Sequence, residues 1–590
     1  MIDYAKELNV EQISAIDHDG NVYLVACPGS GKTRTLVYKL AKELEAGSSS
    51  KKKIAAITYT NVAADEIKER IVDLGVDTSA LWIGTIHSFC LDWILRPFAQ
   101  YIVELEHGFT VVDNHTSEEI ITALCTEYSS PRINYFDCGY FLNTQGINLS
   151  CGQYKADNVH SVITQYHAIL SENKQIDFEQ ILQYSYVLIT RHPDISKSLS
   201  GIFQHILLDE FQDTKELQYQ IVSSIICAGE GRNNIFIVGD PNQSIFGSLG
   251  GYAITIDELR RLTEQEVEQF ELEKNYRSST RIVEYCKNFR VYESNMVSDS
   301  KYKDHAGLIS YSSSTHKDHL VEEISRLIRH HIETLEVSPN EVCVVAPWWI
   351  HLASLTRGLV NSLPEYSFDG PGLTPIYRDR ENFWYRLSRL LLTSPSPNIY
   401  FKRLFWARDL LQAMSELDLC EHSLRDKDLL RIVNSIDLNE QDGLQYLCRA
   451  FEVFSLKIGF SINETSSLQE QLDAFVTSST RRIERIRNEG IDYAGSIKDF
   501  RKAFIPKSGV KVSSIHGVKG EEYETVISFG LLDGMVPHFT DTDKSNTAKK
   551  LLYVIASRAK RHLHLIAETG RRNPPTPTLH NLNYLTYDQV

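Results

Sequence analysis

The sequence of 590 residues lacks the long apolar runs of a membrane protein and the beginning of a secreted one. No window approaches about 18 uninterrupted apolar residues, the length that a membrane-spanning helix requires. Residues 1–7 (MIDYAKE) carry early acidic side chains and no apolar core of signal-peptide length. We therefore expect a cytoplasmic protein without a membrane partner.

The sequence also lacks paired cysteines. Ten cysteines are scattered along the chain and none belongs to a C-x-x-C pair, which favours neither a zinc ribbon nor a disulfide framework. Cys125, Cys138 and Cys151 recur every 13 residues, and three thiolates could ligate a cluster, but no fourth cysteine lies near them. The reading that we favour is three small, buried, reduced side chains.

An excess of basic residues is absent as well. The 61 lysines and arginines stand against 77 aspartates and glutamates, which gives a net charge of −16. This argues against a surface that is basic throughout but leaves room for a local cationic groove, because binding responds to the local potential. The length, with 42% hydrophobic and 23% charged residues and no internal repeat, indicates a globular protein of several domains.

A phosphate-binding loop is the first motif present. The apolar residues 21–26 precede a glycine-containing loop, and a helix-like segment begins near residue 34. The loop fits G-x-x-x-x-G-K-[ST] except that Ala26 replaces the first glycine. Lys32 supplies charge for the β and γ phosphates of ATP, and the Thr33 hydroxyl suits Mg²⁺. We expect phosphate contacts from Ala26, Cys27, Pro28, Gly29, Ser30, Gly31, Lys32 and Thr33.

Two further apolar segments end in polar residues of the kind that ATP hydrolysis needs. Asp209 and Glu210 follow the segment 206–208, where Asp209 would hold Mg²⁺ and Glu210 would polarise the attacking water. The alternative is an acidic loop after a core strand. Gln243 follows a third segment and is expected to sense the γ phosphate.

The order of these segments resembles the UvrD/Rep branch of superfamily 1 helicases. Matching motifs recur at residues 8–12 (LNVEQ), 55–64 (AAITYTNVAA), 83–89 (IGTIHSF), 209–214 (DEFQDT), 239–250 (GDPNQSIFGSLG), 272–278 (LEKNYRS), 514–523 (SIHGVKGEEY) and 552–560 (LYVIASRAK). Eight ordered matches, besides the phosphate-binding loop, are far more specific than any one of them.

The resemblance implies an α/β fold with two RecA-like P-loop domains, each with a parallel sheet and an inserted, mainly helical subdomain. The expected domains are 1–88 with 200–276 and 277–380 with 506–590, and the expected insertions are 89–199 and 381–505. Short β-branched runs at 341–346 and 525–529 support buried strands. Apolar faces of helical spacing support the second insertion: Leu387, Leu390 and Leu391, and then Leu410, Leu411, Met414 and Leu417.

The resemblance also assigns roles to single residues. It places Gln12, Arg34, Tyr276, Arg277, Glu522 and Arg558 at the nucleotide, with Arg277 and Arg558 as catalytic charges opposite Lys32. It places Tyr59 and Phe246 where relatives stack bases, and Asn61, Thr85, His87 and His516 where relatives contact the strand. Stacking tolerates any base, so these residues imply single-stranded DNA as the partner.

The sequence departs from the family at residues 247–250. Relatives read Gly-Trp-Arg-Gly here, whereas this chain reads Gly-Ser-Leu-Gly, so the tryptophan platform and the arginine are missing. The pair Trp348-Trp349 would be a substitute stacking surface or part of a core or interface. The basic segment 480–487 would touch duplex DNA, as in relatives, or be a solvated helix face.

These observations predict an ATP- and Mg²⁺-dependent helicase that moves 3′ to 5′ on single-stranded or tailed duplex DNA. The alternative is a regulatory DNA-binding ATPase that controls a partner nuclease and unwinds little itself. A fused nuclease is not expected, because only about 30 residues follow the last motif. The length and residues 96–98 also resemble the helicase subunits of the Gabija anti-phage system, which work beside a nuclease. Both DNA repair and antiviral defence are therefore candidate roles.

Overall fold

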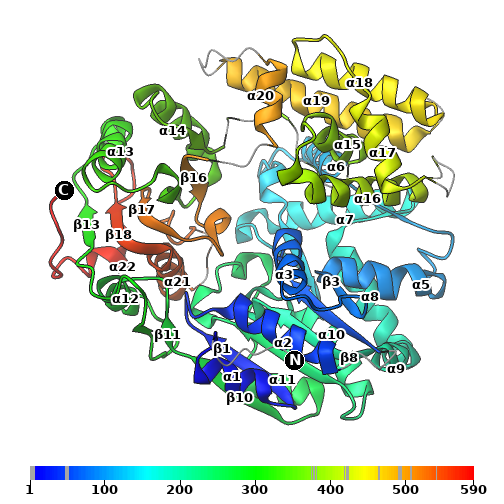
Figure 1. The fold of residues 1–590 in the computed structure, drawn as a ribbon, viewed down its shortest axis with the longest axis horizontal. Helices are drawn as coiled ribbons and strands as arrows, with labels where there is room; N and C mark the ends of the chain where they lie inside the picture. The colour runs from blue at the N-terminus through cyan, green and yellow to red at the C-terminus, as the bar shows by residue number, and fades with distance from the viewer. Residues whose placement is uncertain are drawn as a thin grey trace. The chain divides into compact units, whose positions relative to one another are not determined.

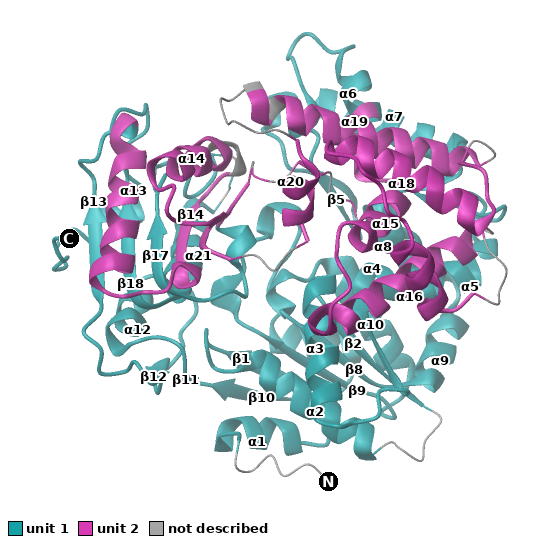
Figure 2. Ribbon diagram, turned by 45° about the horizontal axis from the view of Figure 1, so that its top comes forward, with its two compact units in different colours: residues 1–112, 120–317, 515–590 teal, residues 113–119, 318–514 magenta. Residues whose placement is uncertain are grey.

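The structure is a computed structural model (Figure 1) that divides into two compact units (Figure 2). Unit 1 comprises residues 1–112, 120–317 and 515–590, and unit 2 comprises residues 113–119 and 318–514. The structure describes residues 7–46, 52–371, 373, 375–376, 379, 382–417, 419, 424–462, 465–488, 495–504, 508–539, 541 and 543–590. Within these residues no helix is both long and apolar enough to span a bilayer.

The main sheet of unit 1 has six parallel strands in the order β10-β1-β9-β8-β2-β3. Its central strands are apolar at nearly every position, because helices cover both faces of the sheet. The strands are β1 (Asn21–Ala26), β2 (Lys53–Thr58), β3 (Leu81–Thr85), β8 (Phe203–Asp209), β9 (Asn234–Gly239) and β10 (Val267–Leu272).

Alternate residues of each strand enter two different cores. Leu24 of β1 packs with α2 (Lys32–Ala46) and α3 (Asn61–Asp73) on one face. Its neighbour Tyr23 enters the other core, together with side chains of α4, α8, α9 and α10. The remaining helices of this part of unit 1 are α1 (Val10–Asp17), α4 (Ile86–Cys90), α8 (Phe178–Arg191), α9 (Pro193–Ile202), α10 (Glu216–Ala228) and α11 (Ile256–Thr263).

The strand order brings three sequence motifs to one edge of the sheet. Strand β9 lies between β1 and β8, so Val25 pairs with Gly239 and Val238 pairs with Asp209. The carboxyl ends of parallel strands are where open α/β sheets bind ligands. The loops after β1, β8 and β9 therefore lie next to one another, although more than 200 residues separate the first from the last.

The segment between β3 and β8 is mostly helical, as expected, but it also contains strands that the sequence did not predict. Strands β5 (Tyr140–Asn143) and β6 (Gly146–Leu149) form an antiparallel hairpin before α7 (Ala156–Glu172). A short parallel pair joins β4 (Thr110–Val111) to β7 (Gln175–Ile176). Helices α5 (Arg96–Phe98) and α6 (Asn114–Cys125) complete the segment, with residues 113–119 assigned to unit 2.

Unit 1 also contains a second group of parallel strands, in which β18 lies between β13 and β17. The bounds of its elements are β11 (Lys274–Asn275), α12 (Thr280–Lys287), β12 (Val297–Ser298), β13 (Leu308–Ser312), β17 (Tyr523–Ser528), α21 (Lys544–Ser557), β18 (Ala559–Ile566) and α22 (Pro577–His580). The predicted strand 525–529 corresponds to β17.

Unit 2 combines three parallel strands with a helical region. Strand β16 lies between β14 and β15, and β14 corresponds to the predicted strand 341–346. In the helical region Leu387, Leu390 and Met414 are buried around Trp384. The elements of unit 2 are α13 (Leu320–Arg329), β14 (Val342–Ala346), α14 (Trp349–Ser362), β15 (Phe368–Asp369), α15 (Phe383–Leu391), α16 (Tyr400–Glu416), α17 (Asp426–Asn434), α18 (Gly443–Ile458), α19 (Ser466–Asn488), α20 (Ile497–Lys502) and β16 (Val510–Ser514).

The fold is thus α/β with parallel sheets and helical regions, which confirms the expected fold class. The four domain ranges predicted from the sequence stay predictions, since the division into two compact units does not follow them.

Candidate nucleotide and nucleic-acid site

The phosphate-binding loop joins the buried end of β1 to the N-terminus of α2, as the sequence predicted. Gly29 and Gly31 have positive φ values of 69° and 85°, which L side chains rarely adopt. A Cβ at Gly29 would lie 2.6 Å from the Cβ of Arg277. Ala26 is different, because it is the last residue of β1, fully buried, and outside the positive-φ set. Its position needs a small residue but no glycine.

Residues outside the phosphate-binding loop donate hydrogen bonds to its carbonyl groups. The Gln12 side-chain amide donates to the Ser30 carbonyl at 3.0 Å, and Asn275 donates to the Pro28 carbonyl at 2.7 Å. The backbone N–H of Tyr276 donates to the Gly29 carbonyl at 2.9 Å. These bonds fix the loop before any phosphate arrives, which lowers the ordering cost of binding.

Tyr276 and Arg34, two of the residues predicted to contact the nucleotide, lie beside the loop. The phenol oxygen of Tyr276 accepts a hydrogen bond from the Asn9 amide at 2.8 Å, and 40% of Tyr276 is exposed. Arg34 forms an ion pair with Glu7 at 2.7 Å. Tyr276 therefore has a free ring surface for stacking, whereas Arg34 must leave a carboxylate in order to contact a ligand.

Asp209 and Glu210 adjoin the loop at the end of β8. Glu210 has a left-handed backbone with φ of 53°, and its carboxylate lies 4.0 Å from the Lys32 ammonium. Burial opposes ionisation of Glu210, but the charges of Lys32 and Lys519 outweigh it, so the pKa of Glu210 falls to about 2. Burial and the neighbouring Glu210 charge raise the pKa of Asp209 to about 7. One carboxylate is thus ionised at neutral pH and the other is poised to ionise.

The acidic residues fit a magnesium ion that also contacts phosphates. Burial raises the pKa of Asp209, Asp213 and Asp240, so this part of the site accommodates additional positive charge. The described residues hold no group of three or more His, Cys, Asp or Glu side chains arranged for a metal. Mg²⁺ does not need such a group, because it commonly takes one or two carboxylates and completes its shell with water and substrate phosphates. Thr33 and Asp209 stay the predicted ligands of this ion.

Arg558 and Gln243 form a buried pair beside the acids. The Arg558 guanidinium donates to the Gln243 side-chain oxygen at 2.5 Å, and the Gln243 amide donates to Asp240 at 2.7 Å. Burial and the nearby Arg277 charge lower the pKa of Arg558 to about 9, so it stays positively charged at neutral pH. Two residues separated by 315 positions in the sequence thereby meet, and their expected roles at the γ phosphate stay predictions.

Arg277 is held by two partners on the C-terminal segments of unit 1. Its Nε donates to Glu522 at 2.6 Å and its Nη1 donates to the Ser557 carbonyl at 2.9 Å. Burial opposes ionisation of Glu522, but Arg277 outweighs it and lowers the pKa of Glu522. The structure therefore brings together all six residues predicted to be catalytic: Lys32, Asp209, Glu210, Gln243, Arg277 and Arg558.

An aromatic cavity of about 370 Å³ lies at the carboxyl ends of β2, β3 and β8. Tyr59 and Phe246 line it with ring centroids 5.0 Å apart, and 45% of Tyr59 is exposed. Thr85 and His87 line it as well, and the ring centroid of His516 lies 5.2 Å from that of Phe246. Five of the six residues predicted to contact DNA thus gather at one place. Asn61 lies apart from the cavity lining, as an exposed residue at the start of α3.

Two polar atoms in the lining of this cavity have no hydrogen-bond partner. Nε2 of His87 is buried, and burial lowers the pKa of His87 to about 4, so the ring is neutral at pH 7. Oδ1 of Asp213 is buried as well. Most buried polar atoms have a hydrogen-bond partner in the protein or in ordered water, so these two atoms are available to a bound group.

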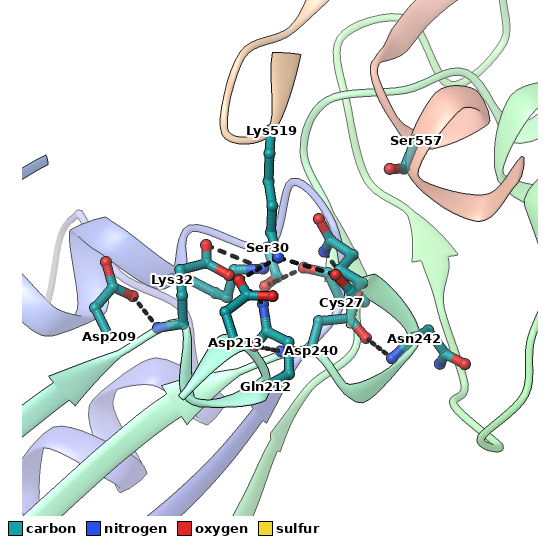
Figure 3. Close-up of polar contacts among 12 residues, drawn as sticks. Cys27, Ser30, Lys32, Asp209, Gln212, Asp213, Asp240, Asn242, Lys519 and Ser557 are labelled. Atoms are coloured by element: carbon teal, nitrogen blue, oxygen red, sulfur yellow. Dashed lines mark hydrogen bonds and ion pairs between the residues drawn. The ribbon is translucent and has the colours of Figure 1, made fainter. Parts of the chain in front are cut away.

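Lys519 contacts both the polar residues of the nucleotide site, among which Figure 3 shows its side chain, and an aromatic residue of the cavity. Its ammonium donates to the Asp213 carboxylate and, at 2.9 Å, to the Gln243 carbonyl. The same ammonium lies 5.3 Å from the centre of the Phe246 ring. One side chain therefore contacts the acidic segment after β8, the Gln243 carbonyl and an aromatic residue of the cavity.

Sequence reasoning missed Lys519, Asp213 and Asp240 as individual residues, although each lies inside a motif that it identified. Tyr140, Glu179 and Lys215 also line the aromatic cavity, and no motif marks them.

The structure bears on three further alternatives from the sequence, which concern the cysteines, the tryptophan pair and the basic segment. Cys125 and Cys138 lie in a buried cluster with their sulfur atoms 3.5 Å apart, which agrees with small core side chains. Trp348 is partly buried in unit 2, while the Trp349 side chain lies outside the described residues. The basic segment 480–487 belongs to α19, where Arg481 is largely exposed and 3.9 Å from Glu119. The stacking role of the tryptophans and the DNA role of this helix stay predictions.

Comparison with known proteins gives two family matches. Residues 8–264 match the model of the UvrD/REP helicase N-terminal domain, and residues 460–570 match that of the UvrD-like helicase C-terminal domain. The ATP-dependent DNA helicase PcrA of Staphylococcus epidermidis is 24% identical, over 96% of this chain and 84% of that protein. The PcrA of Bacillus subtilis is 24% identical over 94% of this chain and 82% of its own length, and that of Staphylococcus aureus is 23% identical over 96% and 83%.

Proposed function

This chain belongs to the UvrD/Rep family of ATP-hydrolysing DNA helicases, and from that premise we propose that it moves 3′ to 5′ along single-stranded DNA. The direction is the one that the family resemblance implies, and the coupling of ATP to the strand is supported by the contacts of Lys519, which joins Gln243 to the aromatic ring of Phe246. A movement at the nucleotide is thereby transmitted to the place where bases would stack.

Hydrolysis at this site would depend on charges from both parts of unit 1. Lys32 is the first residue of α2, beside the first sheet, while Arg558 precedes β18 and contacts Gln243. When ATP binds, these cations would turn from their present partners to the γ phosphate and stabilise the charge that develops in the transition state. Glu210, ionised by its cationic surroundings, would orient the attacking water. Release of phosphate would separate the cations again and so change the DNA contacts.

Mg²⁺ would be held by the Thr33 hydroxyl and the Asp209 carboxylate. When bound, it would neutralise phosphate charge and favour transfer to water. The raised pKa of Asp209 means that this carboxyl group must lose a proton as the ion binds.

Strand displacement decides the polarity. The purified chain should unwind a duplex with a 3′ single-stranded tail, leave 5′-tailed and blunt duplexes intact, and hydrolyse ATP faster with single-stranded DNA. Glu210→Gln serves as the inactive control. Unwinding from the 5′ tail would contradict the direction, and a DNA-independent ATPase would contradict translocation itself.

A second candidate is a regulatory ATPase that acts beside a separate nuclease, for example in antiviral defence. The observation that favours it is the exposed turn Gly247–Leu249, which carries serine and leucine in place of a large aromatic platform. The protein should then co-purify from its native cells, at mild salt, with a second chain whose DNA cleavage depends on ATP. A monomer that elutes alone and displaces strands at full rate would exclude this role.

A further inference from the structure

The hairpin β5–β6 contacts the turn Gly247–Leu249 and the residue after it, and the proposed activity does not account for it. The Ser150 hydroxyl, just beyond β6, donates to the Ser248 carbonyl at 2.8 Å. Phe141 of β5 lies against Gly250, where a Cβ would come within 2.5 Å of the ring. Gly250 has a φ of 88°, so neither its backbone nor its surroundings admit a side chain. The hairpin thus closes directly onto this turn.

The hairpin is itself anchored to helices of unit 1. The Tyr140 hydroxyl donates to the Asp177 carboxylate and lies 2.8 Å from Nε2 of His167 on α7. The Leu142 N–H donates to Glu179 of α8 at 3.0 Å, and Thr144 donates to Glu216 of α10 at 2.6 Å. Bonds along both the strand and the tip therefore hold the hairpin in one position.

Backbone hydrogen bonds connect the turn to Phe246. The carbonyl of Phe246 accepts the N–H groups of Leu249 and Gly251 at 2.9 and 3.1 Å. After the turn, Gly251 bridges to Lys215 and the Tyr252 N–H donates to the Thr214 carbonyl at 3.1 Å. Displacement of the turn must therefore displace the peptide that carries the Phe246 ring.

We propose that the hairpin β5–β6 is a positioning element that holds the Phe246 ring in the orientation that stacks on single-stranded DNA. Phe141 and Ser150 are its positioning residues, and neither needs to touch the strand. The hairpin thereby fixes a turn whose Ser248 and Leu249 side chains are exposed. This inference rests on the proposed DNA-binding function and names the residues that support it.

Steady-state ATPase separates positioning from catalysis. Ser150→Ala and Phe141→Ala should each raise the DNA concentration for half-maximal stimulation by about two- to tenfold, the effect of losing one modest interaction. The DNA-free rate and the rate at saturating DNA should stay within about twofold, because the nucleotide residues are untouched. Ser150→Thr should restore the half-maximal concentration, and Gln145→Ala, at the exposed tip of the same hairpin, should leave it unchanged. An equal fall of every rate would mean general damage and overturn the proposal.

A double-mutant cycle tests whether the hairpin acts through Phe246. In the Phe246→Ala background, Phe141→Ala should change the half-maximal DNA concentration by less than about 1.5-fold, since the ring that it positions is gone. Effects that multiply instead would show a separate contact of the hairpin with DNA, and would overturn the proposal.

A DNA-free readout keeps the inference separable from the helicase function. Phe246→Trp places an indole in the cavity, and its emission is isolated by subtracting the same chain without that change. Acrylamide quenching of this emission should rise about twofold when Phe141→Ala is added, because the turn loosens. Unchanged quenching would refute the hairpin's role. If the wild-type chain shows no DNA-stimulated hydrolysis while quenching rises, the proposed function fails and the positioning contact stands.

Discussion

Glu210 is the residue at which turnover should be most sensitive, since its left-handed backbone aims an ionised carboxylate at the phosphate-binding loop. We predict that Glu210→Gln and Lys32→Ala each lower ATP turnover by about a hundredfold or more. Only Glu210→Gln should still bind ATP, because Lys32→Ala removes phosphate charge. Equilibrium binding of a fluorescent ATP analogue, beside steady-state hydrolysis, checks both statements.

The control for this pair is Glu268→Gln, which removes an exposed carboxylate of β10. It should leave both binding and turnover unchanged. Hydrolysis at the wild-type rate by Glu210→Gln would remove the proposed mechanism.

Asp209 gives the activity a pH dependence. Its pKa of about 7 means that at pH 6 most molecules carry a proton where Mg²⁺ must bind. The apparent Mg²⁺ affinity should therefore rise with pH, by up to about tenfold per unit below pH 7, and level off above it. Magnesium titrations of ATPase from pH 6 to 8 measure this.

Asp209→Asn supplies the matched comparison, because the nucleotide's own titration is the same in both proteins. Asp209→Asn should bind Mg²⁺ more weakly than the wild type, and its apparent Mg²⁺ affinity should not fall further as the pH drops below 7. If the apparent Mg²⁺ affinity changed with pH in the same way in both proteins, the titrating group would be a residue other than Asp209.

The paired rings of Tyr59 and Phe246 lead to a prediction about binding. Replacing either by alanine should weaken binding of single-stranded DNA by about 1 to 3 kcal/mol. The double variant should lose less than the sum, since the rings touch at 5.0 Å and orient each other. Fluorescence anisotropy of labelled oligonucleotides measures the losses, with the exposed Phe136→Ala as the control. Full affinity in the double variant would exclude the cavity from the DNA path.

At the scale of elements, the turn Gly247–Leu249 departs most from the family pattern. Its side chains are exposed, and the bond from Ser150 uses only the backbone carbonyl of Ser248. Ser248→Trp should therefore be accommodated and, by adding a stacking surface, should raise strand displacement more than ATPase. Gel-based unwinding of a 3′-tailed duplex tests it, with Ser248→Leu as a control for size. No gain would show that another surface already serves.

Elements with local signals could be predicted from the sequence, and elements held by distant contacts could not. Strand β1, the loop and α2 were predictable because apolar periodicity, glycines and Lys32 lie within one short stretch. The hairpin β5–β6 was missed, since its anchors Asp177, Glu179 and Glu216 lie 37 or more positions away. The role of Lys519 was missed for the same reason, because its partner Asp213 is 306 positions away.

At the scale of the whole molecule, an acidic chain is expected to bind an acidic polymer. With a net charge of −16, affinity must come from local cations and not from the overall charge. Binding of single-stranded DNA should therefore weaken from 50 to 200 mM salt, with a logarithmic slope of about −0.7 for each phosphate neutralised. Anisotropy titrations at several salt concentrations give the slope. A slope of zero would contradict the prediction, because it would mean that no phosphate contacts contribute and that base stacking alone binds the strand.

Ala26 has a consequence for finding related proteins. Because this position lies inside a buried strand and only Gly29 and Gly31 need left-handed backbone, the first glycine of the familiar signature is dispensable in this fold. A pattern search that insists on it would pass over this chain, and would pass over any homologue in which the position has drifted to alanine. A pattern anchored on the two later glycines, Lys32 and Thr33 would retrieve such homologues, provided that a strand precedes it and a helix follows.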